Sequence, residues 1–105
     1  MAMSREEILA AIKEKVVSVV PDATVMLFGS RARGDWHEES DWDILVLTNE
    51  NVTHELNDKV FDAIYPLSLE IFSIIQTVVA NVNDWEQHPG WYSLSLSIKN
   101  DLVNV

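Results

Sequence analysis

Two aspartates, Asp41 and Asp43, stand at the start of an apolar run that continues to Thr48. An ionised carboxylate on a buried strand is costly to desolvate unless a cation or a charged partner neutralises it. Because side chains alternate between the two faces of a strand, residues two apart point to the same side and could bracket one or two divalent cations. Carboxylate ligands suit Mg²⁺, with Mn²⁺ as the alternative, and few of them leave coordination positions for substrate phosphates.

A third carboxylate, Glu70, could complete such a site. It is the single charged residue in the apolar run Leu67–Ile75, which we predict to be a strand. If that strand lies beside the one beginning at Asp41, Glu70 could hold a second cation that activates an attacking hydroxyl. Three acids on one sheet face would then form a two-metal site for phosphoryl or nucleotidyl transfer.

A glycine turn upstream supplies groups suited to phosphate. Gly29 would let the backbone approach a phosphate closely, and Ser30 offers a hydroxyl, an amide and the start of a helix whose positive end faces the anion. Arg31 and Arg33, two of only seven Lys and Arg residues, could add charge-assisted contacts to a triphosphate. These four residues are therefore candidate nucleotide ligands.

Taken alone, each feature has a simpler explanation. An Asp-x-Asp pair at a strand start is more often a turn or a cap, and Glu70 could be a solvated residue on an edge strand. Arg31 and Arg33 could pair with nearby acids such as Asp35. It is the combination that favours a metal and phosphate site.

Hydrophobic periodicity and turn residues predict the elements that would position these side chains. Ser4 and Glu7 have the spacing of a capping box, and Pro21 closes the helix that they open. Residues 76–87 remain open between an extension of the third strand and a new helix. The predicted elements are helix Ser4–Val20, strand Ala23–Gly29, strand Asp41–Thr48, helix Thr53–Ile64 ended by Tyr65-Pro66, strand Leu67–Ile75, and a helix opened by Pro89-Gly90 with the stripe Leu94, Ile98 and Leu102.

This order of elements predicts an α/β (α+β) fold, a small mixed sheet of three to four strands with helices packed on it. Alternation along the second strand predicts two different faces. One face carries Asp41, Asp43, Leu45 and Leu47, and the other carries Trp42, Ile44 and Val46.

The composition limits the classes of function. With 105 residues we expect a single domain, residues 1–105. A net charge of -10 disfavours direct binding to nucleic acid or anionic lipid and favours a cation or a basic partner. The absence of cysteine excludes disulfides and thiolate chemistry, and no apolar run predicts a membrane span. Because the N-terminus is charged too early for a signal peptide, we expect a cytoplasmic location.

The segment LFGSRARG, the ten residues between Ser30 and Asp41, and the segment DWDILV together resemble the signature of the DNA polymerase β nucleotidyltransferase superfamily. More narrowly, they resemble the minimal nucleotidyltransferases, which are often encoded beside a HEPN-domain partner. The resemblance extends from the first helix through the predicted strand with Glu70, and more loosely to the closing helix.

The resemblance implies roles for the candidate residues. Gly29 and Ser30 would match the loop that holds the nucleotide phosphates, and Asp41 and Asp43 the two metal-ligating aspartates. Glu70 would take the place of the third carboxylate, where family members commonly have Asp.

The activity that the resemblance implies is transfer of a nucleoside monophosphate, with two Mg²⁺ ions and release of pyrophosphate. The minimal members resemble the antitoxin half of toxin-antitoxin pairs, which adenylylate a tyrosine of a HEPN ribonuclease. We therefore expect AMP transfer from ATP to such a toxin, with a partner or a second copy forming the other wall of the site. The alternative is a non-catalytic acidic module that uses the same fold to neutralise a basic partner.

Overall fold

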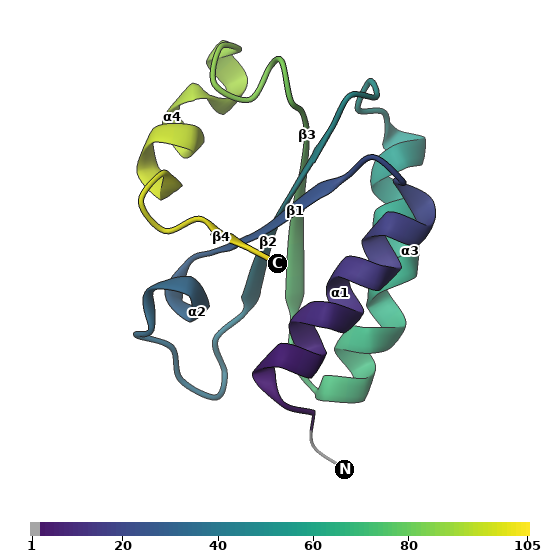
Figure 1. The fold of residues 1–105 in the computed structure, drawn as a ribbon, viewed down its shortest axis with the longest axis vertical. Coiled ribbons are helices and arrows are strands. Elements are labelled where there is room, and N and C mark those ends of the chain that lie inside the picture. Colours follow the sequence, from purple (N-terminus) through teal and green to yellow (C-terminus); the bar gives the residue numbers. More distant parts are fainter. Residues whose placement is uncertain (1–2) are drawn as a thin grey trace.

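The computed structural model describes residues 3–105, which form one mixed sheet with helices on both faces (Figure 1). The predicted fold class is therefore confirmed. None of the helices in this described range is long and apolar enough to cross a membrane. The elements are α1 (Arg5–Val19), β1 (Thr24–Phe28), α2 (Ser30–Arg33), β2 (Trp42–Thr48), α3 (His54–Ile71), β3 (Ile75–Asn81), α4 (Pro89–Ile98) and β4 (Val103–Asn104).

The start of α1 is encoded locally, as predicted. The Glu7 amide donates to Ser4 Oγ at 3.1 Å, and the Ser4 amide donates to Glu7 Oε1 at 3.1 Å, which completes the capping box. One face of the helix buries Ile8, Ile12 and Val16. Both its caps and its apolar spacing could be seen in the sequence, so the prediction is confirmed to within a residue at each end.

The end of α3 was predicted wrongly. The helix does not stop before Tyr65-Pro66 but continues to Ile71, with Pro66 inside it. Its apolar stripe explains why, because the buried residues Ile64 and Leu67 fall on either side of the proline at helical spacing. Pro66 is exposed, and its cost of about 3 kcal/mol in a helix interior is offset by packing of the last turn.

The third strand consequently begins later than predicted. The segment Leu67–Ile75 contains the end of α3 and a turn, and β3 runs from Ile75 to Asn81. Of the two possibilities for residues 76–87, the structure takes the strand and follows it with turns. A continuous apolar run has no clear period of its own, which is why the helix end and the strand start could not be separated.

The strand order is β3-β2-β1-β4. β1 is antiparallel to β2 and to β4, and β2 is parallel to β3, with α3 as the crossover between them. Figure 1 shows α1 and α3 side by side on one face of the sheet and α4 on the other.

The two faces of β2 are those that alternation predicted. Trp42, Ile44 and Val46 pack with residues of α1 and α3 in one hydrophobic cluster. Leu45 belongs to a second cluster on the side of α4, where Leu47 packs against it. By the same alternation, the side chain of Asp43 belongs to the α4 face of the sheet.

Candidate functional site

The glycine turn after β1 brings the backbone against the carboxylate of Asp43. Gly29 has φ 77° and ψ -161°, a conformation that is essentially restricted to glycine. A Cβ added to Gly29 would overlap Asp43 Oδ2, so no other residue fits there without displacing the carboxylate. Both the backbone angles and the close approach therefore explain the glycine at this position.

Ser30 opens α2, which is only four residues long. The amides of Ala32 and Arg33 both donate to the Gly29 carbonyl at 3.0 Å, and the turn ends at Gly34, with φ 93°. A helix this short contributes one turn of backbone rather than the extended dipole that we expected. The half-buried Ser30 nevertheless follows directly on the contact between Gly29 and Asp43.

Asp41 and Asp43 lie at the start of the central strand, and Asp43 pairs with Phe28 of β1 in the sheet register. Both residues are half-buried. Burial raises the pKa of Asp43, the negative charge of Asp41 raises it further, and the charge of Arg33 opposes the rise. Two carboxylates, one of them partly desolvated, are a donor set that a divalent cation would neutralise.

The second arginine of the turn, Arg33, lies on the side of this carboxylate pair. Its guanidinium contacts Asp101 Oδ2 at 3.0 Å and Asp35 Oδ2 at 3.3 Å, and these hydrogen bonds raise the pKa of Arg33. Its side chain is 46% exposed. Arg33 thus remains a candidate for contact with an anionic ligand, while its pair with Asp101 ties the segment after α4 to α2.

Arg31 is oriented differently from the prediction. The residue is only 8% exposed, and its Nε and Nη2 donate to the Ser40 carbonyl at 3.1 and 3.0 Å. Nη2 also lies 3.4 Å from the carbonyls of His37 and Glu38. The guanidinium is thus committed to the loop between α2 and β2. Its role is to hold that loop, in place of the phosphate contact that we had expected.

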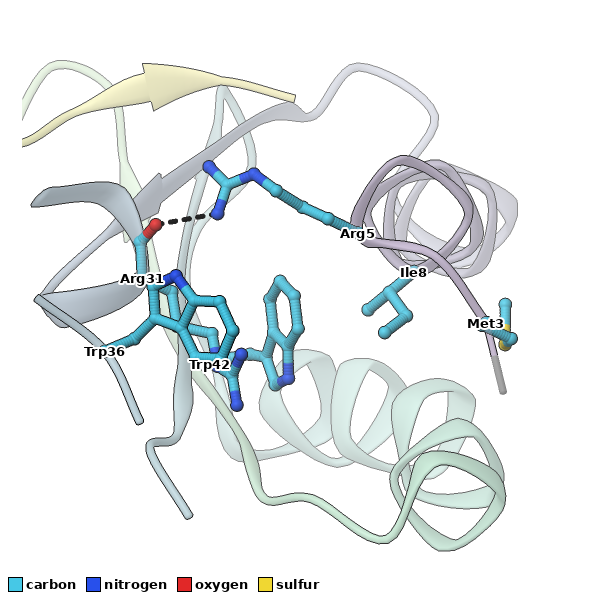
Figure 2. A pocket seen from close by; sticks show the side chains of 6 residues that line it. All are labelled: Met3, Arg5, Ile8, Arg31, Trp36 and Trp42. Carbon is cyan, nitrogen blue, oxygen red and sulfur yellow. Dashed lines mark hydrogen bonds between the residues drawn. The ribbon is translucent and has the colours of Figure 1, made fainter. Parts of the chain in front are cut away.

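Two tryptophans complete the environment of Arg31, as Figure 2 shows. The guanidinium carbon lies 4.7 Å from the ring centroid of Trp36 and 4.2 Å from that of Trp42, distances at which cation–π attraction operates. The Arg31 carbonyl accepts from Arg5 Nη1 at 2.8 Å. Trp36 within this loop and Trp42 directly after it were the signal in the sequence that could have predicted this arrangement. A small pocket of about 180 Å³ here is lined by Met3, Arg5, Ile8, Arg31, Trp36 and Trp42.

The structure does not bring Glu70 to Asp41 and Asp43. Glu70 is an exposed residue in the last turn of α3 rather than a strand residue, so the placement on which its predicted role depended is wrong. Moreover, α3 covers the face of the sheet opposite to the one on which Asp43 projects. Within residues 3–105, no group of three or more Asp, Glu, His or Cys side chains is placed to hold a metal ion.

The residue beside Asp43 on the neighbouring strand is Gln76. The parallel register of β2 and β3 pairs these two residues directly. Val78 and Ala80, two and four residues further on, pack in the cluster on the α4 side, so Gln76 projects from the same face as Asp43. Sequence reasoning missed Gln76 because the strand start was misplaced; alternation along residues 75–81 was the signal that could have found it.

Residues 6–87 match the family described as "Nucleotidyltransferase domain". The chain belongs to this family, and the matched range contains the glycine turn, both aspartates and Gln76.

One curated relative and two solved structures are similar to this chain. A Methanocaldococcus jannaschii protein named "Putative protein adenylyltransferase MJ0141" is 35% identical over 75 residues, covering 70% of this chain and 76% of the relative. A structure described as "a putative nucleotidyltransferase from Sulfolobus solfataricus" is 31% identical with a TM-score of 0.52, covering 91% of this chain and 75% of that one. A structure described as "the toxin-antitoxin with AMP-PNP" shares the fold at 24% identity and a TM-score of 0.56, covering 68% of this chain and 56% of that one.

Proposed function

We propose that this protein transfers AMP from ATP to a hydroxyl group of another protein, a tyrosine of a HEPN ribonuclease toxin, and thereby acts as its antitoxin. The single observation that carries the transferase part is the contact between the Gly29 backbone and the Asp43 carboxylate. In this contact the Gly29 turn, whose backbone suits a phosphate, lies against Asp43, one of two carboxylates that suit a cation.

Each residue of the site has a separate role in binding the nucleotide or the cation. Gly29 and Ser30 bind the phosphates, and Arg33 adds positive charge at their edge. Asp41 and Asp43 hold Mg²⁺, with Mn²⁺ as a substitute. The bound cation supplies Lewis-acid polarisation of the phosphate oxygens.

The reaction itself is a substitution at the α-phosphorus of ATP. The acceptor oxygen forms a bond to this phosphorus as the bond to the bridging oxygen of the β-phosphate breaks. Pyrophosphate leaves, and the acceptor proton passes to solvent. The main contribution of this chain is to hold the triphosphate in line with the acceptor, because positioning and charge stabilisation dominate such transfers.

The choice of acceptor and partner has two supports. The relative from Methanocaldococcus jannaschii is named as a protein adenylyltransferase, which favours a protein acceptor over a small molecule. The HEPN toxin is proposed from the sequence signature, and the net charge of -10 suits a basic partner. Such a partner, or a second copy of this chain, would form the wall of the site that faces away from the sheet.

A labelling experiment tests this proposal. The purified protein is incubated with Mg²⁺, ATP labelled at the α-phosphate, and the HEPN protein encoded beside it. We expect label on the HEPN protein, and we expect Asp43→Asn to abolish the labelling. The control is Glu14→Gln, which removes one negative charge from the exposed side of α1. A folded protein that binds Mg²⁺ and ATP but labels no acceptor would contradict the transferase proposal.

A second function is favoured by Gln76, a neutral residue where a third carboxylate would complete a two-metal site. In this alternative the protein is a non-catalytic acidic module that neutralises its partner by binding. The double variant Asp41→Asn, Asp43→Asn separates the two functions. It should still bind and inhibit the partner if binding alone is sufficient, and it should bind without inhibiting if transfer is required.

A further inference from the structure

The position beside Asp43 on β3 determines how many cations the site can hold. Neighbouring strands lie about 4.8 Å apart, so a cation ligated by Asp43 is within reach of the side chain that projects next to it. Gln76 is that residue, exposed at the start of β3 and on the same face of the sheet. The third ligand position of the site is therefore occupied by a neutral amide.

The charges present suffice for one divalent cation. Asp41 and Asp43 together carry two negative charges, which match one Mg²⁺ ion. A second ion on the acceptor side would share Asp43 with the first and would have no carboxylate of its own. An amide oxygen can ligate Mg²⁺, but it brings no charge to offset the repulsion between two divalent ions.

Among the residues that the structure describes, no other acid joins Asp41 and Asp43 in a group that could replace the missing carboxylate. Glu70 belongs to the helix on the opposite face of the sheet. Across the described range 3–105, no set of three metal-ligating side chains comes together. Apart from Asp41, the charge that acts on the pKa of Asp43 is that of Arg33, which is a cation.

We propose that Gln76 limits this site to a single divalent cation, the one that binds together with the triphosphate. The inference rests on the proposed nucleotidyl transfer and deepens it, because it leaves the acceptor hydroxyl without a metal ion. Binding of the nucleotide is retained, and transfer depends on how easily the acceptor loses its proton. A phenol, with an ordinary pKa of about 10, needs a second cation far less than an aliphatic alcohol does.

Equilibrium dialysis with Mn²⁺ and α,β-methylene-ATP, which cannot release pyrophosphate, tests this inference. The quantity measured is the ratio of Mn²⁺ to nucleotide retained with the protein. We expect one Mn²⁺ per nucleotide for the wild type and two for Gln76→Asp or Gln76→Glu, the second of which keeps the size of the side chain. Gln76→Asn is the matched neutral control and should stay at one.

The outcomes separate this inference from the proposed function. Retention of nucleotide tests the function, and the metal ratio tests the inference. A ratio of two in the wild type would overturn the inference, as would a ratio of one in both carboxylate variants. A wild-type protein that retains no nucleotide would overturn the proposed function and, with it, the role given to Gln76.

A kinetic readout accompanies the dialysis. If the carboxylate restores a second cation, transfer to the acceptor should rise by about 10-fold or more at saturating Mg²⁺ in the better of the two carboxylate variants. Glu14→Gln, on the exposed side of α1, should leave the rate near that of the wild type. A carboxylate variant with two bound cations and an unchanged rate would show that the missing ion does not limit transfer, and would overturn that part of the inference.

Discussion

The two faces of the sheet differ in how completely they are covered. On one face, α1 and α3 close over a cluster of fourteen buried hydrophobic residues that includes Ile44 at the centre of β2. On the other, the shorter α4 covers a cluster of four among the described residues, and alternation along β2 puts Asp43 at the end of that face. Burial on the first face supplies most of the stability. The second face can consequently leave two acids partly open to a ligand.

The largest effect should come from removing side-chain volume on the well-covered face. Ile44→Ala should lower the free energy of unfolding by about 4 kcal/mol, near the upper end for such substitutions, because Ile44 is fully buried between the sheet and two helices. Leu45→Ala, equally buried but facing α4, should cost about 2 kcal/mol. Urea unfolding measures both. An equal or greater cost for Leu45→Ala would show that the two faces contribute alike.

The next effect concerns the glycine turn between β1 and α2. Gly29→Ala should cost about 2 to 3 kcal/mol, because alanine is strained at this φ and ψ and its Cβ overlaps Asp43. It should also weaken nucleotide binding by displacing the carboxylate. Gly34→Ala is the matched control: its φ is also positive, but an added Cβ meets no atom within 4 Å, so about 1 kcal/mol is expected. Thermal unfolding and nucleotide titration distinguish the two variants.

Substitution of Arg31 should mainly lower the stability of the fold, whereas substitution of Arg33 should mainly weaken nucleotide binding. Arg31→Met should lower the free energy of unfolding by about 2 kcal/mol, because it removes charge-assisted hydrogen bonds and the contact with two indole rings. Arg33→Met should cost less than about 1 kcal/mol, since its ion pairs are exposed, yet it should weaken nucleotide binding. If Arg33→Met destabilised the fold more than Arg31→Met, the roles given to the two residues would be reversed.

The smallest effect should be the contribution of Asp43 to the pH dependence of the free energy of unfolding. Its raised pKa means that the folded protein keeps this proton over a pH range in which the unfolded chain has lost it. In the absence of divalent cations, the free energy of unfolding therefore falls as the pH rises through that range. Asn at position 43 does not titrate, so Asp43→Asn should be more stable relative to the wild type at neutral pH than at about pH 3. Urea unfolding with EDTA at both pH values checks the sign.

Sequence reasoning succeeded where the determinants are local. The capping box of α1, the alternation along β2 and the glycine turn each depend on residues a few positions apart. Gly29, Asp41 and Asp43 come from one short segment, so their proximity follows once β1 pairs with β2. This part of the candidate site could be predicted without the structure.

The remainder depends on tertiary contacts that no local pattern encodes. Pro66 would end an isolated helix, but packing on the sheet stabilises α3 beyond the proline, as far as Ile71. That error shifted the third strand and put Glu70 in the position that Gln76 occupies. Arg31 was predicted to face a ligand because the carbonyls and rings that surround it come together only in the folded loop.

The parallel pairing of β2 with β3 also has a consequence for how the protein folds. Gly29 and Asp43 are joined through antiparallel strands with a modest separation along the chain, whereas Gln76 reaches Asp43 only after the whole of α3 has docked. Contacts between residues far apart in sequence are entropically expensive to close and form slowly. The pairing of β1 with β2, which brings Gly29 to Asp43, should therefore form before β3 docks, and a nascent chain released before β3 would carry both aspartates without Gln76 beside them.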